Sequence, residues 1–203
     1  MRIALIGATG NVGSKILTEA LSRGHQVTGI ARNVEKLKGR AGVTPKQADL
    51  ANEKQLAEAI RGHDAVIVSV RHQHNDVLHA FAAAKAAGLK RVVIVGGAAS
   101  LEVSPGVRLV DTPNFPAEIK VEALPAAEAL KRIREEKLLE WSFVSPSIML
   151  VPGERTGKFR LGGDQLLKDA KGDSRISQED LAVAIIDELE KPGHIRKRFT
   201  VGY

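Results

Sequence analysis

The sequence predicts an α/β protein with a mainly parallel, doubly wound sheet, helices on both faces and a small C-terminal excursion. Near-continuous apolar runs of strand length, such as 2–6 and 65–70, are typical of parallel strands buried on both faces. These runs alternate with helical patterns, and a glycine-rich turn joins the first run to the first helix. The 203 residues, 43% hydrophobic and 27% charged, fit a single domain, 1–203, with an ordinary core.

The elements follow in order along the chain. Apolar runs predict strands at 2–6, 26–31, 43–48, 65–70, 91–95, 141–145 and 199–201. Helical spacing predicts helices at 12–21, 53–60, 75–87, from about 121 or 125 to 137, and from 177 to 189. Ser177 is the expected N-cap of the last helix, because a polar side chain follows three residues on.

Two stretches lack a regular pattern. The segment 104–116 holds three prolines and predicts a loop over the active site. The segment 147–175 predicts the excursion on the substrate side, with a small hairpin formed by 159–161 and 165–167 around a glycine pair.

The glycine-rich turn between the first strand and the first helix predicts a site for a dinucleotide. Gly7 allows a sharp turn off the strand, Gly10 allows a diphosphate to approach the backbone, and Gly13 allows the helix to pack closely on the sheet. The free N–H groups at the start of the helix then face the phosphates. The predicted binding residues of this turn are Gly7, Thr9, Gly10, Asn11, Val12 and Gly13.

Three motifs together resemble a known family. Gly-Ala-Thr-Gly-Asn-Val-Gly at 7–13 is similar to the atypical branch of the short-chain dehydrogenase/reductase superfamily. The stretches 95–101, 152–158 and 198–203 resemble bacterial proteins of an NADH-flavin reductase group, close to NmrA-like and biliverdin reductase B-like proteins. The resemblance covers essentially the whole chain and implies a Rossmann-type fold with NAD(P)H-dependent oxidoreductase activity.

The resemblance also implies roles for residues at two further strand ends. In the family, an Asp and an apolar residue after the third strand border the adenine, which here are Asp49 and Leu50. Asp49 is equally a candidate to cap the helix at 53–60. A serine or threonine often follows the fifth strand in this superfamily, and Ser100 is the candidate catalytic donor here; its other reading is a cap of the following loop.

The end of the second strand decides which nicotinamide cofactor is favoured. An acidic residue there binds the ribose of NAD, whereas a basic residue accepts the 2′-phosphate of NADP. Arg32 holds this position, so NADP(H) is favoured over NAD(H), with a solvated surface arginine as the alternative. Strand ends in open α/β sheets also place Val70, Arg71, Ser145 and Pro146 at the cofactor crevice. Arg155 and Lys158, in the basic loop of the excursion, are candidate substrate contacts.

The composition limits the chemistry. The common dehydrogenases of the superfamily use a Tyr-x-x-x-Lys pair, but the only tyrosine here is Tyr203, so carbonyl reduction and sugar epimerisation become unfavourable readings. Hydride transfer to a flavin such as FMN or FAD, as a substrate, has no such requirement because both rings supply their own electronics. The alternative is a non-catalytic, NmrA-like sensor of the cofactor's redox state that acts through a protein partner.

Other classes of function, such as metal binding and nucleic-acid binding, fit the sequence less well. There is no cysteine, which excludes disulfides and thiolate metal sites, and His72, His74 and His79 lack metal-ligand spacing, so they are expected to be solvated and no metal is predicted. The net charge of +6 raises the question of nucleic acid, but five Phe, one Trp and one Tyr are too few for an obvious stacking surface. The basic run 196–198 is expected to be a solvated connection. No run approaches a membrane span, a cytoplasmic monomer or homodimer is expected, and the predicted partner is a small-molecule substrate.

Overall fold

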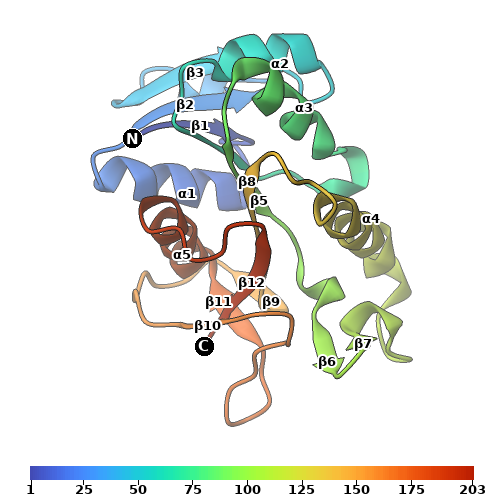
Figure 1. Cartoon of the computed structure of the whole chain (residues 1–203). Helices are drawn as coiled ribbons and strands as arrows, with labels where there is room; N and C mark the ends of the chain where they lie inside the picture. Colours follow the sequence, from blue (N-terminus) through green and yellow to red (C-terminus); the bar gives the residue numbers. More distant parts are fainter.

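The computed structural model describes residues 1–203 and is organised around one eight-stranded sheet. The strand order is β10-β12-β8-β5-β4-β1-β2-β3, and every neighbouring pair is parallel except β10 with β12 (Figure 1). The strands are β1 Arg2–Ile6, β2 Gln26–Ala31, β3 Val43–Gln47, β4 Ala65–Val68, β5 Arg91–Val95, β8 Glu140–Pro146, β10 Arg160–Gly162 and β12 Lys197–Gly202. This confirms the predicted Rossmann-type, doubly wound arrangement, in which the order reverses between β1 and β4.

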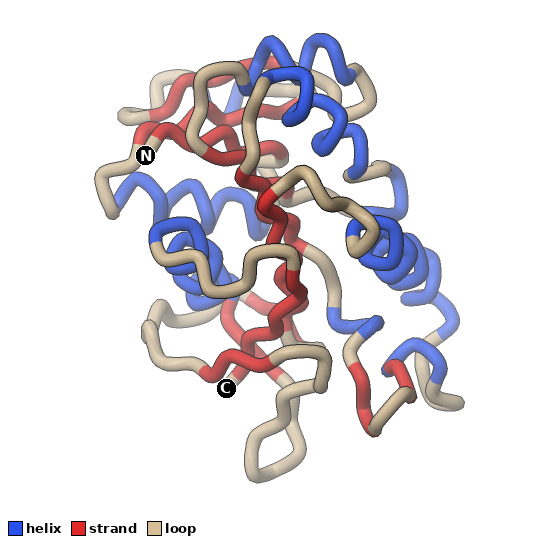
Figure 2. The backbone as a smooth tube through the Cα atoms, in the orientation of Figure 1, coloured by secondary structure: helices blue, strands red, loops and turns tan.

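Five helices cover the two faces of the sheet, as the backbone tube shows (Figure 2). They are α1 Asn11–Ser22, α2 Glu53–Ile60, α3 Leu78–Ala87, α4 Ala117–Ile133 and α5 Gln178–Glu190. The side chains of α2, α3 and α4 share one apolar cluster with the sheet, whereas those of α1 and α5 share a second cluster on the opposite face. Both faces of the central strands are therefore buried, which is why β1, β4 and β5 are almost wholly apolar.

Two short paired segments lie outside the main sheet. The strands β6 Glu102–Ser104 and β7 Val107–Arg108 form an antiparallel hairpin, and β9 Met149–Val151 pairs in parallel with β11 Arg175–Ser177. The first pair corrects the prediction of an irregular loop over 104–116. The predicted hairpin of 159–161 with 165–167 is also wrong, because β10 pairs with β12 of the main sheet instead.

The fourth helix differs most from its predicted bounds. It begins at Ala117 and ends at Ile133, and Pro125 lies inside it. Proline normally breaks a helix because it removes one backbone hydrogen bond. Here the burial of small and apolar side chains on both sides of Pro125, including Ala123, Ala126 and Leu130, favours a continuous helix.

Helix caps follow the sequence closely at one helix and not at another. Ser177 caps α5, since its Oγ accepts the Asp180 N–H at 2.9 Å. Helix α2 is capped by Asn52, whose Oδ1 accepts the Gln55 N–H at 3.1 Å. Asp49 therefore does not cap this helix; its Oδ1 accepts the Ala51 N–H at 3.0 Å in the preceding turn. None of the helices is long and apolar enough to cross a membrane.

Candidate functional site

Two glycines of the first turn are required for the backbone to pack as it does, whether or not a ligand is bound. Gly7 has a φ of +84°, and a Cβ there would lie 2.0 Å from the carbonyl oxygen of Ser69. A Cβ on Gly13 would lie 2.0 Å from the carbonyl oxygen of Gly7. These two residues allow β1, the turn and α1 to pack at the edge where the strands end, as their place in the motif predicts.

Gly10, in contrast, is exposed and less crowded. A Cβ there would contact only the Gly7 carbonyl oxygen, at 3.3 Å. It is the N-cap of α1 but offers no side-chain cap, and the backbone N–H groups of Asn11, Val12 and Gly13 have no hydrogen-bond partner. No acidic residue lies in the first turn of α1. This arrangement of unpaired N–H groups and positive helix-dipole charge fits a diphosphate.

Arg32 after β2 and Asp49 after β3 are also accessible to solvent. Arg32 directly follows β2, is exposed, and its guanidinium makes no ion pair or hydrogen bond. Asp49, Ala51, Asn52 and Glu53 line an open hollow of about 620 Å³, whereas Leu50 is buried. Arg32 and Asp49 follow the neighbouring strands β2 and β3, so both predicted contacts for the adenosine part lie at one edge of the sheet.

At the centre of the crevice, β4 is followed by residues of contrasting exposure. Val70 is half-buried and Arg71 is exposed, but His72 is only 6% exposed, which corrects the expectation that this histidine is solvated. His72 Nε2 lies 2.9 Å from the Val95 carbonyl oxygen, so it is the donor, and the His72 N–H donates to Glu122 Oε1 at 2.8 Å. Burial lowers the pKa of the His72 imidazole, which favours its neutral form, and Nδ1 has no partner.

Three further residues predicted at the site are buried or hydrogen-bonded within the protein: Ser145, Pro146 and Ser100. Ser145 is fully buried, its Oγ has no partner, and Pro146 is buried next to it. Ser100 accepts a hydrogen bond of 3.1 Å from Arg198, which is itself ion-paired with Asp164. Arg198 is 8% exposed and lies within β12, so it is not part of a solvated connection as predicted, whereas Arg196 and Lys197 of the same run are exposed. The roles of Ser100, Ser145 and Pro146 towards a ligand stay predictions.

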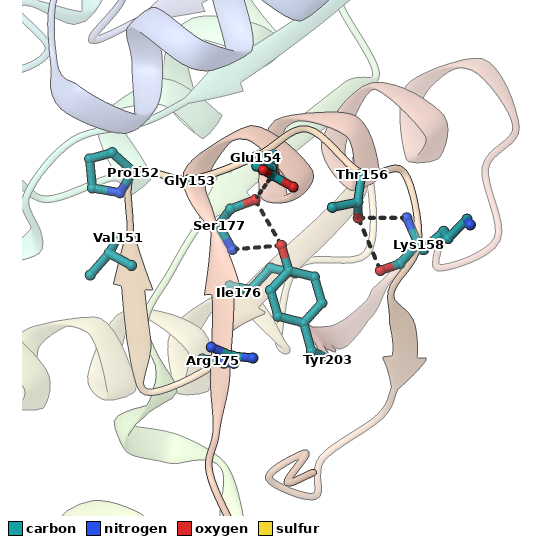
Figure 3. A pocket seen from close by; sticks show the side chains of 10 residues that line it. All are labelled: Val151, Pro152, Gly153, Glu154, Thr156, Lys158, Arg175, Ile176, Ser177 and Tyr203. Atoms are coloured by element: carbon teal, nitrogen blue, oxygen red, sulfur yellow. Dashed lines mark hydrogen bonds between the residues drawn. The ribbon is translucent and has the colours of Figure 1, made fainter.

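The two basic residues predicted in the excursion lie in different environments. Arg155 forms a two-pronged ion pair with Glu19 of α1, at 2.6 and 2.7 Å. The guanidinium of Arg155 holds the pKa of the Glu19 carboxyl below its usual range, against the opposing effect of burial. Lys158 instead lines a pocket with Tyr203 and has no ion pair (Figure 3).

The only tyrosine is engaged away from the first turn. Its hydroxyl donates to Asp180 Oδ2 at 2.8 Å. It also accepts the Ser177 N–H at 3.3 Å (Figure 3). Asp180 is fully buried and also accepts hydrogen bonds from Thr156 Oγ1 at 2.5 Å and from the Gly157 N–H at 2.8 Å. Tyr203 therefore secures the excursion against α5.

Three residues with defined roles were missed from the sequence. His72 connects the ends of β4 and β5 to α4, while Glu19 and Asp180 anchor the excursion on α1 and α5. The helical position of Glu19 was a usable signal, because it lies on the same face as the apolar Ile16 and Ala20. No local pattern indicates the partners of His72 or Asp180, which are distant in sequence.

Comparison with known proteins identifies the family. The family of NAD(P)H-binding domains matches residues 7–192. The uncharacterized protein YwnB of Bacillus subtilis (strain 168) is 40% identical over 211 residues, which cover 99% of this chain and 98% of YwnB.

Two solved structures share the whole fold. One from Bacteroides thetaiotaomicron, described as a "putative epimerase", is 41% identical, with a TM-score of 0.95 over 100% of this chain and 96% of that one. One from Streptococcus pneumoniae TIGR4, described as "a putative NADH-flavin reductase", is 33% identical, with a TM-score of 0.87 over 100% and 99%. The descriptions differ in chemistry but the fold and the length agree. This chain therefore belongs to the NAD(P)H-binding family and shares its Rossmann-type fold with both solved relatives.

Proposed function

We propose that this protein is a reductase that uses NADPH and transfers a hydride to a flavin or a similar conjugated acceptor. The observation that carries the proposal is the uncapped start of α1, where three N–H groups without partners lie behind Gly10 at a crevice that contains no tyrosine. The first part of this observation supports a nicotinamide dinucleotide, and the second part supports an acceptor that needs no protein acid.

The residues of the crevice bind and orient rather than exchange protons. The N–H groups of Asn11, Val12 and Gly13 would hold the diphosphate, and Arg32 would meet the 2′-phosphate that distinguishes NADPH from NADH. Val70 and Arg71 lie at the end of β4, where they can position the nicotinamide. When bound, the dihydronicotinamide supplies the hydride and the conjugated acceptor takes it into its own ring system.

Carbonyl reduction and epimerisation are less well supported. In the superfamily these reactions use a tyrosine activated by a lysine, which reaches the substrate oxygen. The hydroxyl of Tyr203 is instead hydrogen-bonded to the buried Asp180 and to the backbone of Ser177. An acceptor such as FMN avoids this requirement.

The test is a direct assay with NADPH and FMN in the absence of oxygen. We expect the absorbance of the reduced nicotinamide to fall in proportion to enzyme, and to fall faster with NADPH than with NADH. The variant Gly10→Asp serves as the control for contaminating host reductases, because it should stay folded but lose turnover. Tight binding of NADPH without turnover on FMN, FAD or quinones would contradict the proposal and favour a redox sensor that acts through a protein partner.

A further inference from the structure

A second pocket, separate from the first turn, lies within the excursion. We call it the excursion pocket; it has a volume of about 520 Å³, within the range of small-molecule sites (Figure 3). It is lined by Val151, Pro152, Gly153, Glu154, Thr156, Lys158, Arg175, Ile176, Ser177 and Tyr203. Its walls therefore combine apolar side chains and an aromatic ring with charged groups.

Two cations at the excursion pocket lack an ion-pair partner. Neither Lys158 nor Arg175 forms an ion pair or a side-chain hydrogen bond, although other basic residues nearby, such as Arg155 and Arg160, are bonded. The guanidinium carbon of Arg175 lies 5.9 Å from the centre of the Tyr203 ring. Lys158 and Arg175 lie on opposite sides of this ring, one at each end of the pocket (Figure 3).

The neutral polar groups of the excursion pocket are already satisfied. The hydroxyl of Ser177 donates to the Glu154 carbonyl oxygen at 2.8 Å, and that of Tyr203 donates to Asp180 at 2.8 Å. Thr156 donates to the same carboxylate. A ligand would therefore gain its polar contacts from the charged groups and not from the hydroxyls.

The excursion pocket is lined by fewer acidic than basic side chains. Asp180 lies buried behind Tyr203, and its charge is dispersed over three hydrogen bonds. The side chain of Glu154 is exposed and has no partner. Among the residues that line the pocket, Lys158 and Arg175 thus outnumber the single carboxylate of Glu154, which leaves the lining with an excess of positive charge.

We propose that the excursion pocket binds a planar organic anion, whose ring lies against Tyr203 and Pro152 and whose acidic group is attracted by the positive charges of Lys158 and Arg175. The cations attract the acidic group, and neither is held in an ion pair within the protein, which leaves both available for it. The aromatic and proline surfaces favour a flat apolar body. This site does not depend on hydride transfer, because binding alone defines it.

FMN and riboflavin form a matched pair of probes, since they share one ring system and differ by a phosphate. We would measure their binding by fluorescence anisotropy to protein saturated with NADP⁺, so that the cofactor crevice is occupied. We expect FMN to bind more tightly than riboflavin. Lys158→Ala and Arg175→Ala should each weaken FMN roughly fivefold, and little change is expected for riboflavin.

Two further variants make the test specific. Lys171→Ala removes an exposed lysine from the same excursion but outside the pocket, so it should leave FMN binding unchanged. Glu154→Gln removes the one free carboxylate at the rim and should strengthen FMN binding roughly two- to threefold. A gain from one substitution and a loss from another cannot arise from partial unfolding, and thermal unfolding of each variant verifies the fold.

The proposal is overturned if FMN fails to bind at millimolar concentration, or if riboflavin binds as tightly as FMN. It is also overturned if Lys171→Ala weakens FMN as much as Lys158→Ala does. These results are independent of the NADPH assay. FMN bound at this pocket without turnover would retain the pocket and reject the reductase, whereas turnover of FMN with an FMN affinity unaffected by Lys158→Ala and Arg175→Ala would retain the reductase and reject the pocket.

Discussion

Helices α1 and α5 lie side by side on the same face of the sheet, yet their first turns are built in opposite ways (Figure 1). Helix α5 begins with Ser177, whose hydroxyl caps it, and carries Glu179 and Asp180 in its first turn. Helix α1 begins with Gly10, has no side-chain cap and has no acidic residue in its first turn. The chain thus satisfies one helix start with its own side chains and leaves the other open.

The two helix starts differ in the way that distinguishes a binding site from a purely structural helix end. A capped start gains stability from its own hydrogen bonds, whereas an uncapped start retains N–H groups that a ligand anion can use. Because the two helices share one face and one apolar cluster, packing does not explain the difference. The open start of α1 is therefore best understood through a ligand.

The largest expected effect comes from making α1 resemble α5. Gly10 has φ −74° and ψ 169°, extended values that other residues adopt, so Gly10→Asp can place a carboxylate cap on α1. NADPH affinity should fall at least about 100-fold, or ~2.7 kcal/mol, because the carboxylate occupies the N–H groups and repels the diphosphate. Thermal stability should stay the same or rise. Calorimetric titration and thermal unfolding measure both; an unchanged affinity would contradict the site.

A smaller effect, on stability, is expected at the ion pairs that connect the excursion to α1 and α5. Glu19 contacts Arg155 and Arg23, and Arg23 also reaches Asp187 and Glu190 of α5. Glu19→Gln should lower the free energy of unfolding by about 2 kcal/mol, less than for a wholly buried pair because Arg155 is half-exposed. NADPH affinity should change little.

The stabilisation by Glu19 should also depend on pH. The pKa of its carboxyl is lower in the folded protein than its ordinary value of 4.5, so the unfolded chain binds the proton more readily. The contribution is therefore complete above pH 4.5 and is lost as the pH falls through the lower folded-state pKa. Urea unfolding at several pH values should show the difference between wild type and Glu19→Gln shrinking below pH 4.5; a constant difference would argue against the charged pair.

The preference between cofactors should respond to the far end of the crevice. Arg32→Asp is expected to lower the affinity for NADPH relative to that for NADH roughly tenfold or more, about 1.4 kcal/mol. The reason is that it replaces a cationic partner of the 2′-phosphate with a carboxylate, which repels the phosphate. Titrations with both nucleotides give the ratio. Equal losses for NADPH and NADH would mean that Arg32 does not meet the 2′-phosphate.

The smallest effect is expected from removing the cap of α5, which is the opposite change to adding a cap to α1. Ser177→Ala removes the cap of α5 and should lower the free energy of unfolding by ~1 kcal/mol, as is typical for a lost N-cap. NADPH binding at α1 should be unaffected. A loss of NADPH affinity comparable to that of Gly10→Asp would show that the two helix starts are not independent.

The sequence predicted well wherever a local pattern decides the structure. The strands Arg2–Ile6 and Arg91–Val95 and the helix Glu53–Ile60 have the predicted bounds, because alternation of buried strands and amphipathic helices is visible over short windows. The glycines at 7 and 13 likewise have the spatial requirements that their motif implies.

The predictions that failed depend on distant partners. Arg198 was read as solvated, but it is buried because Asp164, 34 residues earlier, provides its counter-charge. His72 is buried by the end of β5 and by Glu122 of α4. Pro125 stays within α4 because packing outweighs its cost. Such partners are set by the assembled sheet and leave no trace in the neighbouring residues.

Each of the two separate apolar clusters contains or contacts one of the two aromatic residue types that report on unfolding. The chain has a single tryptophan and a single tyrosine, and they lie on opposite faces of the sheet. Trp141 is buried in the cluster beneath α4, whereas Tyr203 packs with the cluster of α1 and α5. Each layer thus carries its own intrinsic optical reporter, so the melting of the two halves can be followed side by side without any label, and coincident curves would show that they unfold as one unit.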